Sequence, residues 1–200
     1  MTDFLAALLG GYVLGSLPTG LIVVRLLSGT DIRKAGSGNI GTVNVYRVAG
    51  LAPSVLVLAV DILKGAVPVL LARAWGYTEA VQVAAGLATI VGHNWSVFLR
   101  FRGGKGIATS FGALLAISPV VGIVAAIVWG LAVGITRYAS LGSLLAVATV
   151  PLTMGWRREP TPHLVFGLVT LIFAVYRHRA NIARLFGGTE LKITDRPRGQ

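Results

Sequence analysis

The chain has 200 residues, of which 54% are hydrophobic and only 12% are charged, and its mean hydropathy is +0.77. Soluble domains carry roughly a quarter charged residues, so this composition excludes an ordinary soluble protein and indicates an integral membrane protein. The net charge is +11 and cysteine is absent, which excludes disulfides, thiol nucleophiles and thiolate metal sites. Because the cations flank apolar runs, they indicate contact with anionic headgroups or substrates and not with nucleic acid.

Apolar runs extend over nearly the whole sequence, so residues 1–200 are interpreted as one transmembrane domain of the all-α class. The first predicted span covers about Phe4 to Leu27, and Pro18 predicts a kink in it because proline removes a helical hydrogen bond. The sequence before this run is acidic and not basic, which indicates a retained span and not a signal peptide.

The second predicted span, Leu51 to Trp75, carries Asp61 and Lys64 inside its apolar run. Residues three apart lie on one face of a helix and can pair. An unpaired charge near the middle of a bilayer costs about 2.5 to 3.5 kcal/mol, so pairing or a polar cavity is expected. Two interpretations stay open, a structural ion pair that holds helices together and a direct contact with substrate.

The third predicted span covers about Ala80 to Leu99. The apolar run from Ile107 to Thr136 is too long for one untilted span, and Ser118-Pro119 predicts a break near its middle. Further spans are predicted at Ala139 to Trp156 and at His163 to Tyr176. The sequence thus predicts seven transmembrane helical elements, and five spans with one re-entrant run is the alternative.

Lysine and arginine gather in the segments that follow the first, third and last predicted spans. Positively charged loops of membrane proteins face the cytoplasm, so the N-terminus is predicted outside and the C-terminus in the cytoplasm. This orientation leaves Arg157 and Arg158 outside. The predicted cytoplasmic cations are Arg33, Lys34, Arg47, Arg100, Arg102, Lys105, Arg177, Arg179, Arg184, Lys192, Arg196 and Arg198.

The first polar loop, Thr30 to Gly50, contains the pattern G-x-G-x-x-G of dinucleotide-binding proteins at residues 36–41. That motif requires a preceding strand, whereas here it follows a membrane span, so a nucleotide is not implied. Short polar donors and an arginine whose fork suits phosphate indicate anion binding, and a solvated membrane loop is the alternative. The candidate residues are Ser37, Asn39, Thr42, Asn44 and Arg47.

A second loop, within Gly92 to Thr109, combines cations with glycines that leave backbone N–H groups uncovered, and phosphate fits this combination best. Arg100 and Arg102 are either membrane anchors or anion ligands, and His93 is either a packing residue or a substrate contact. The lysine and the glycines that frame it are Gly103, Gly104, Lys105 and Gly106.

The polar tail carries His178 and Asn181, three residues apart and therefore on one face if the last helix continues that far. Histidine can act as a general base near neutral pH, and asparagine can orient a substrate or donate to a polar transition state. The alternative is that both residues cap a helix. Glu190 stands in a basic tail and is interpreted as a partner in a structural ion pair.

Together, these segments resemble the bacterial acyl-phosphate-dependent glycerol-3-phosphate acyltransferase family, PlsY. The resemblance covers nearly the whole chain: GSLPTGLI, GSGNIGTVNVYR, DILKG, GHNW, FRGGKGIAT and RHRANIARLFGGTE. Members of this family are integral membrane enzymes that transfer a fatty acyl group from acyl phosphate to the 1-position of glycerol 3-phosphate. The products are lysophosphatidic acid and phosphate, so the resemblance implies the step that opens bacterial phospholipid synthesis.

The resemblance also implies the site residues, position by position. The catalytic residues are expected to be Ser37, Lys105, His178 and Asn181. Substrate is expected to bind Arg47, Gly103, Gly104 and Gly106, and the chemistry of the loops adds Asn39, Asn44 and His93 as candidates. This chain departs from the family at Val43, where the usual sequence GATN has a hydroxyl, and at Arg102, where lysine is common.

The implied chemistry requires no cofactor and no metal, because acyl phosphate carries its own leaving group. The expected partners are glycerol 3-phosphate, acyl phosphate and membrane lipid, with no obligatory acyl carrier protein. The expected location is the bacterial cytoplasmic membrane, with the active site facing the cytoplasm. The H-x-x-x-x-D motif of other glycerolipid acyltransferases is absent, since Phe98, Leu168 and Ala183 stand five residues after the histidines.

A small transporter for phosphate or an organic anion is the competing class, and the Asp61 and Lys64 pair favours it. The clustering of glycine-rich motifs on one side of the membrane argues against it, because alternating access prefers a site near the midplane. A membrane scaffold that binds anionic lipid would explain the charge but not the glycines.

Overall fold

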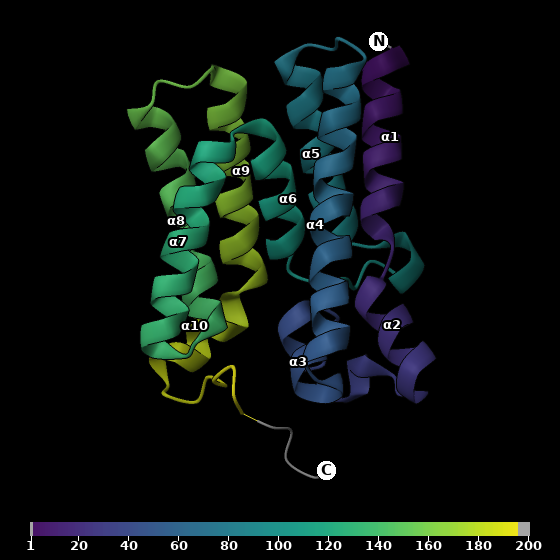
Figure 1. Ribbon diagram of the computed structural model, residues 1–200, viewed down its shortest axis with the longest axis vertical. Helices are drawn as coiled ribbons and strands as arrows, with labels where there is room; N and C mark the ends of the chain where they lie inside the picture. Colours follow the sequence, from purple (N-terminus) through teal and green to yellow (C-terminus); the bar gives the residue numbers. More distant parts are fainter. Residues whose placement is uncertain (1, 196–200) are drawn as a thin grey trace.

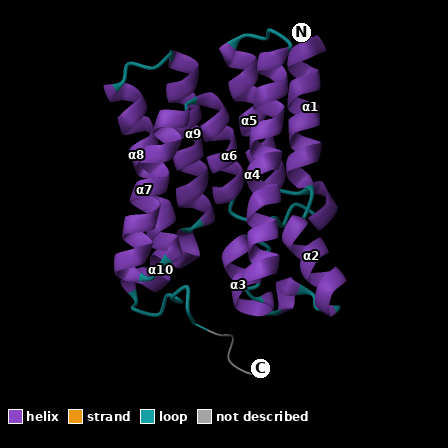
Figure 2. Cartoon of the chain, in the orientation of Figure 1, coloured by secondary structure: helices purple, strands orange, loops and turns teal. Residues whose placement is uncertain are grey.

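The computed structural model describes residues 2–195 of the chain, with side chains from residue 4 onward, and this part is helical without strands (Figure 2). The predicted all-α fold is therefore confirmed. Two of the predicted cytoplasmic cations, Arg196 and Arg198, lie outside the described residues.

The first apolar run forms two helices, α1 (Thr2–Ser16) and α2 (Thr19–Ser28). The kink predicted at Pro18 is a complete break, because Leu17 and Pro18 are both outside the helices. The two halves still form one apolar stretch, Phe4–Ser28, that is long enough to cross a membrane.

The first polar loop contains two short helical elements that the sequence did not predict. A single 3₁₀ turn, η1 (Ile32–Lys34), is followed by the short helix α3 (Thr42–Ala49). In α3, Asn44 and Val45 face the interior of the protein while Tyr46 stays exposed. This amphipathic helix packs on α4 and fixes the loop that precedes it.

The helix α4 (Leu51–Ala74) continues the chain and is the longest of the described helices. It is followed by α5 (Glu79–Asn94), a second 3₁₀ turn η2 (Val97–Leu99), and α6 (Ile107–Ile117). The predicted third span reached Leu99, but the helix ends at Asn94. Its last carbonyl groups, those of His93 and Asn94, accept hydrogen bonds from Gly104 and Gly103, so the glycine loop closes the helix.

The predicted break at Ser118-Pro119 is confirmed, since α6 ends at Ile117 and α7 (Pro119–Thr136) begins at the proline. The chain then forms α8 (Ala139–Trp156), α9 (Thr161–Arg177) and α10 (Arg179–Phe186). The last helix does not run on to Asn181 as one piece, because His178 interrupts it between α9 and α10.

Four helical stretches are long and apolar enough to cross a membrane: Phe4–Ser28, Leu51–Ala74, Pro119–Thr136 and Ala139–Trp156. The helices α6 and α9 are apolar but shorter. In Figure 1, α1 begins at the upper end of the bundle, whereas α3, α10 and the yellow tail lie at the lower end. Successive long helices run in opposite directions between these ends.

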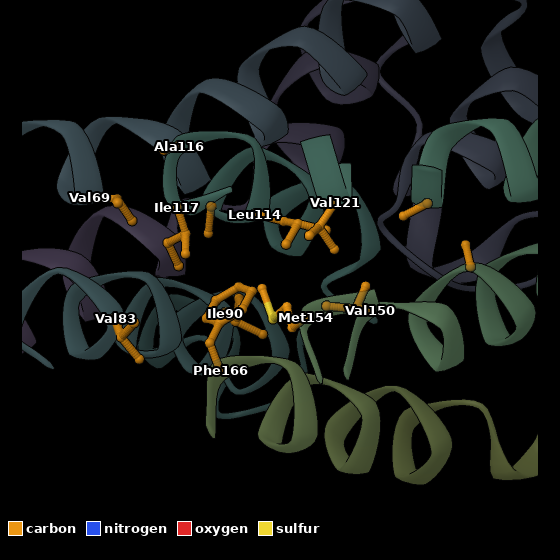
Figure 3. Close-up of a cluster of buried hydrophobic side chains, with 13 residues drawn as sticks. Val69, Val83, Ile90, Leu114, Ala116, Ile117, Val121, Val150, Met154 and Phe166 are labelled. Carbon is orange, nitrogen blue, oxygen red and sulfur yellow. The ribbon is translucent and has the colours of Figure 1, made fainter. Parts of the chain in front are cut away.

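The main core lies where α4 to α9 meet, and Figure 3 shows its side chains pointing toward one another. Phe166 from α9 and Met154 from α8 are completely buried, and they pack with Ile90 from α5 and Leu114 from α6. A second cluster joins α2, η1, α3 and α4 through Val24, Ile32, Val45 and Val57. The second cluster holds the first polar loop in place.

Candidate active site

A cavity of about 660 Å³ brings together residues from all three polar segments and from the helices around them. One part of its wall is polar and carries the cations Arg47, Lys105 and Arg184. The other part is apolar and reaches Val150 and Phe166 in the main core. The polar lining residues are Ser37, Asn39, Thr42, Asn44, Arg47, Ser54, Asp61, His93, Lys105, Ser110, Ser140, Ser143, Thr170, His178, Asn181, Arg184 and Glu190.

A chain of hydrogen bonds joins the second loop to the polar tail. The Lys105 Nζ donates to Asn181 Oδ1 at 2.7 Å, and Asn181 Nδ2 donates to Glu190 Oε1 at 2.6 Å. The same carboxylate accepts from Ser140 Oγ at 2.7 Å and from Arg184 Nε at 2.8 Å. The ion pair predicted for Glu190 is therefore confirmed, with Arg184 as its partner.

Burial changes the proton affinity of these groups. It lowers the pKa of Lys105 to about 8, because desolvation disfavours the ammonium form more than the nearby Glu190 charge favours it. Burial alone would raise the pKa of Glu190, but hydrogen bonds from Asn181, Ser140 and Arg184 outweigh it and the pKa is lowered. At neutral pH the site therefore holds a charged lysine beside a charged carboxylate.

His178 lies at the junction of α9 and α10 and is 2% exposed. Burial and the charge of Lys105 lower the pKa of His178 to about 4, so the ring is neutral at pH 7. Its Nδ1 lies 2.8 Å from the carbonyl oxygen of Ala174, which can only accept, so Nδ1 carries the proton. The Nε2 atom is then the acceptor nitrogen of the ring.

Arg47 connects the first polar loop to the polar tail. Its Nη2 donates to the carbonyl oxygens of Leu191 at 3.2 Å and Lys192 at 2.8 Å. Its Nε is buried and has no partner among the described residues. A charged donor that is buried without a partner at a cavity wall is a position that an anion would satisfy.

Gly103 and Gly104 of the second loop, both predicted substrate contacts, pack closely against the end of α5. The N–H groups of Gly103 and Gly104 already donate to Asn94 and His93, and their carbonyl groups accept from Arg177. A side chain at Gly103 or Gly104 would collide with the backbone or ring of His93. Only glycine therefore lets this loop lie against α5.

Gly106 differs from the other two because it lines the cavity. Its φ of 77° is in the left-handed region that favours glycine, and it directly precedes α6. Ile107 and Ala108, in the first turn of α6, also line the cavity. The positive end of the α6 dipole thus faces the space beside Lys105.

Hydrogen bonds from Asn44 fix the conformation of the first polar loop. Its Nδ2 donates to the carbonyl groups of Ile32, Ala35 and Asn39, and its Oδ1 accepts from the backbone N–H of Ser37. The side-chain amide of Asn44 therefore stabilises the loop. It has no free N–H left to donate to substrate, although Asn44 was predicted to bind substrate. Ser37 is exposed at the cavity wall.

Asn39 also has a local role, since its Oδ1 accepts from the N–H of Gly41 at 2.9 Å. Thr42 is one of the candidate anion-binding residues, without a specific role predicted for its hydroxyl. That hydroxyl is buried, lines the cavity and has no partner among the described residues. The neighbouring Val43 also lines the cavity.

Ser140 and Ser143 of α8 also belong to the candidate site, although the sequence did not predict them. Both line the cavity, and Ser143 Oγ accepts from Trp129 Nε1 at 3.3 Å while donating to the carbonyl group of Ala139. Their spacing of three residues inside an apolar run was the available signal, because it puts two hydroxyl groups on one face of a helix.

The predicted pairing of Asp61 with Lys64 is confirmed, at 2.8 Å between Oδ1 and Nζ. Lys64 Nζ also donates to the carbonyl oxygen of Leu17 at 2.9 Å, in the break between α1 and α2. The pair thus holds α4 against a helix break. His93 Nδ1 lies 3.9 Å from Asp61, too far for a hydrogen bond, and its buried ring faces the glycine loop.

Within residues 2–195, no group of three or more His, Cys, Asp or Glu side chains is placed to hold a metal ion. The cavity carries the cations Arg47, Lys105 and Arg184, and its two carboxylates, Asp61 and Glu190, are already paired with Lys64 and Arg184. This arrangement suits anionic ligands.

The chain is similar in sequence to known glycerol-3-phosphate acyltransferases. The family profile described as glycerol-3-phosphate acyltransferase matches residues 5–188. A glycerol-3-phosphate acyltransferase of Desulforamulus reducens is 43% identical over 186 residues, which is 93% of each chain. Glycerol-3-phosphate acyltransferase 2 of Moorella thermoacetica is 47% identical over 193 residues, covering 96% of this chain and 99% of the relative.

A similar fold occurs in a crystal structure of PlsY, an integral membrane glycerol 3-phosphate acyltransferase, in its glycerol 3-phosphate form. The TM-score is 0.91 at 38% identity, and the match covers 94% of both chains. A second crystal structure, the lysophosphatidic acid form, gives a TM-score of 0.88 at 37% identity. On the family match, the relatives and the fold, this chain belongs to the glycerol-3-phosphate acyltransferase family.

Proposed function

We propose that this chain transfers a fatty acyl group from acyl phosphate to the 1-hydroxyl of glycerol 3-phosphate, giving lysophosphatidic acid and phosphate. The observation that carries this reaction is the division of one cavity into a cationic part and an apolar part. Both substrates carry phosphate, and one of them also carries a long hydrocarbon chain. A cavity with both characters fits this pair of ligands.

The apolar part begins beyond Ser140 and Ser143 of α8, where Ala146, Val147 and Val150 line the cavity. Trp129 of α7 and Phe166 of α9 line the same space. We place the acyl chain here, with its phosphate toward Lys105.

The cationic part supplies more than one phosphate contact. Lys105 and the N-terminal turn of α6 form one candidate position, since helix N-termini favour anions. The buried Nε of Arg47 and the hydroxyl of Thr42 form another, because both lack partners among the described residues. Cations at both positions offset the repulsion between two anionic substrates.

The reaction joins the glycerol oxygen to the acyl carbon and breaks the bond from that carbon to the phosphate oxygen. The phosphate leaves with the bonding electrons, and Lys105 stabilises the charge that develops on it. The hydroxyl proton passes to His178 Nε2 or to a substrate phosphate. Alignment of the hydroxyl at about 3 to 3.5 Å from the acyl carbon supplies several kcal/mol of the barrier reduction.

We also propose the orientation of the chain in the bacterial cytoplasmic membrane. Seven helical elements cross or enter the bilayer, the N-terminus lies outside, and the cavity opens to the cytoplasm. The positive-inside rule supports this orientation, because the motif-bearing loops carry most of the cations. Arg157 and Arg158 are exceptions in the turn between α8 and α9, and the charge of Arg157 is paired with Glu159 at 3.1 Å.

The proposal is tested with purified protein and radiolabelled glycerol 3-phosphate, supplied with palmitoyl phosphate, palmitoyl-CoA or palmitoyl acyl carrier protein. We expect labelled lysophosphatidic acid from palmitoyl phosphate alone. Product from a thioester donor would overturn the donor assignment. Absence of product with every donor, in protein shown to be folded, would overturn the acyltransferase activity and favour anion transport, which liposome uptake would then measure.

A further inference from the structure

A second pocket, of about 790 Å³, is lined by residues of the first and second polar loops. Arg33 and Lys34 of η1 line one side of it, and Arg100 and Arg102 line the other. Asp31 is the acidic lining residue, and Arg33 already binds it through two hydrogen bonds at 2.6 and 2.9 Å. Three cations of this basic pocket therefore remain uncompensated, and none of them lines the active cavity.

Residues 37–41 of the first polar loop separate the basic pocket from the active cavity. Ser37, Asn39 and Gly41 line the active cavity, whereas the intervening Gly38 and Ile40 line the basic pocket. This alternation occurs within a turn in which Gly36 and Gly38 have φ of 58° and 72°. An occupant of the basic pocket would thus contact the back of a loop that we assign to substrate.

The other wall of the basic pocket is a firmly built turn. Arg100 and Phe101 both have φ in the left-handed region, at 51° and 61°, which is uncommon for residues with side chains. Hydrogen bonds from Leu99 N–H and Phe101 N–H to the carbonyl group of Ser96 hold this conformation. The pocket is therefore preformed and does not depend on a loop becoming ordered.

Large apolar side chains adjoin these cations on the outer surface. Phe98 lines the pocket and is 56% exposed, and the neighbouring Phe101 is 60% exposed. A soluble phosphate would gain nothing from exposed aromatic rings. A phospholipid would gain from both features, because its phosphate meets the arginines while its acyl chains cover the rings.

We propose that the basic pocket binds the phosphate of an anionic phospholipid from the surrounding membrane. Arg100, Arg102 and Lys34 pair with the headgroup, and the acyl chains lie against Phe98 and Phe101. This inference does not depend on which acyl donor the enzyme uses, and its test is a measurement of binding and not of catalysis.

The test titrates purified protein in neutral detergent with short-chain phosphatidylglycerol and records the bound lipid by native mass spectrometry. Phosphatidylcholine of the same chain length measures binding without net negative charge. Inorganic phosphate and glycerol 3-phosphate, each added as a competitor, distinguish a lipid site from a site for soluble phosphate. We expect phosphatidylglycerol to bind at least tenfold more tightly than phosphatidylcholine, and neither soluble competitor to displace it.

The double variant Arg100→Gln/Arg102→Gln should weaken phosphatidylglycerol binding at least tenfold, while Arg100→Lys/Arg102→Lys should retain most of it. The matched control is Arg157→Gln/Arg158→Gln, which removes two arginines from the turn between α8 and α9 and should bind like the unmodified protein. Thermal unfolding shows whether each variant is folded. Equal binding by the two glutamine variants, or displacement of the lipid by glycerol 3-phosphate, would overturn the proposal.

Discussion

Lys105 combines a positive charge with apolar surroundings, and both matter for its proposed role. Its ammonium group contacts the tail through Asn181, and burial lowers its pKa to about 8. A buried cation interacts strongly with an anion because little water screens the attraction. The same burial makes the charge sensitive to pH within a range where the enzyme can be assayed.

Replacement of Lys105 by alanine should lower kcat/KM for glycerol 3-phosphate about a hundredfold or more, the usual effect of removing one donor to developing charge. The assay is steady-state acyl transfer from palmitoyl phosphate. Lys192→Ala is the matched control, because the Lys192 side chain is exposed on the tail and does not line the cavity. Comparable activity in both variants would show that Lys105 has no role in transfer.

The pH dependence of kcat/KM should reveal the same residue. Below about pH 8 Lys105 is charged and can bind phosphate, and above about pH 8 it loses its proton, so kcat/KM should fall as the pH rises. In Lys105→Arg this alkaline decline should move to higher pH, because a guanidinium group keeps its charge. An unchanged decline in the arginine variant would assign the titration to another group.

At the scale of single residues, the sequence indicated which side chains would gather but not how each would be used. Arg47, Lys105, His178 and Asn181 meet at one cavity, as predicted. Asn44 instead holds its own loop, and the N–H groups of Gly103 and Gly104 hold the end of α5. A polar side chain or amide can serve a ligand or the backbone equally well, and only the neighbouring acceptors decide between them.

At the scale of helices, close approach between α4 and α6 places Lys105 beside the cavity. Gly65 of α4 lies against the carbonyl group of Thr109, and Gly112 of α6 lies against the carbonyl group of Ile62. Small residues at such contacts allow two helix backbones to pack directly, which is a common device in membrane proteins. The start of α6, and with it the loop, is positioned by this contact.

Gly65→Ala should separate α4 from α6 and destabilise the protein by about 1 to 3 kcal/mol, since its new methyl group meets backbone atoms that cannot rotate away. Thermal unfolding in detergent measures the effect. Gly130→Ala in α7 is the control, because Gly130 has open space around it and alanine favours a helix. Equal unfolding temperatures would show that the close contact between α4 and α6 is not required.

The sequence predicted the break at Pro119 because proline acts locally on its own helix. It did not predict α3, because eight residues are too few to show a clear period and the helix depends on packing against α4. The sequence also did not predict that α5 ends at Asn94. Its last carbonyl groups accept hydrogen bonds from residues of the following loop, which lie several positions further along the chain.

At the scale of the whole molecule, the absence of cysteine allows a direct test of orientation. Thr78→Cys lies in the exposed turn between α4 and α5, and Thr189→Cys lies in the exposed tail. In intact cells, a membrane-impermeant maleimide should label Thr78→Cys and not Thr189→Cys. Permeabilised cells should show labelling of both variants, and the reverse pattern in intact cells would invert the proposed topology.

The sequence by itself determined that the protein is helical and apolar enough for a membrane, where its long apolar run breaks, and where its polar, glycine-rich segments lie. These properties depend on composition and on residues close together in the chain. The tertiary structure decided that Arg47, Lys105 and Glu190 share one cavity and that Arg33 and Arg102 face a separate pocket. Such choices depend on which helix faces pack together, and this follows from contacts between residues far apart in the sequence.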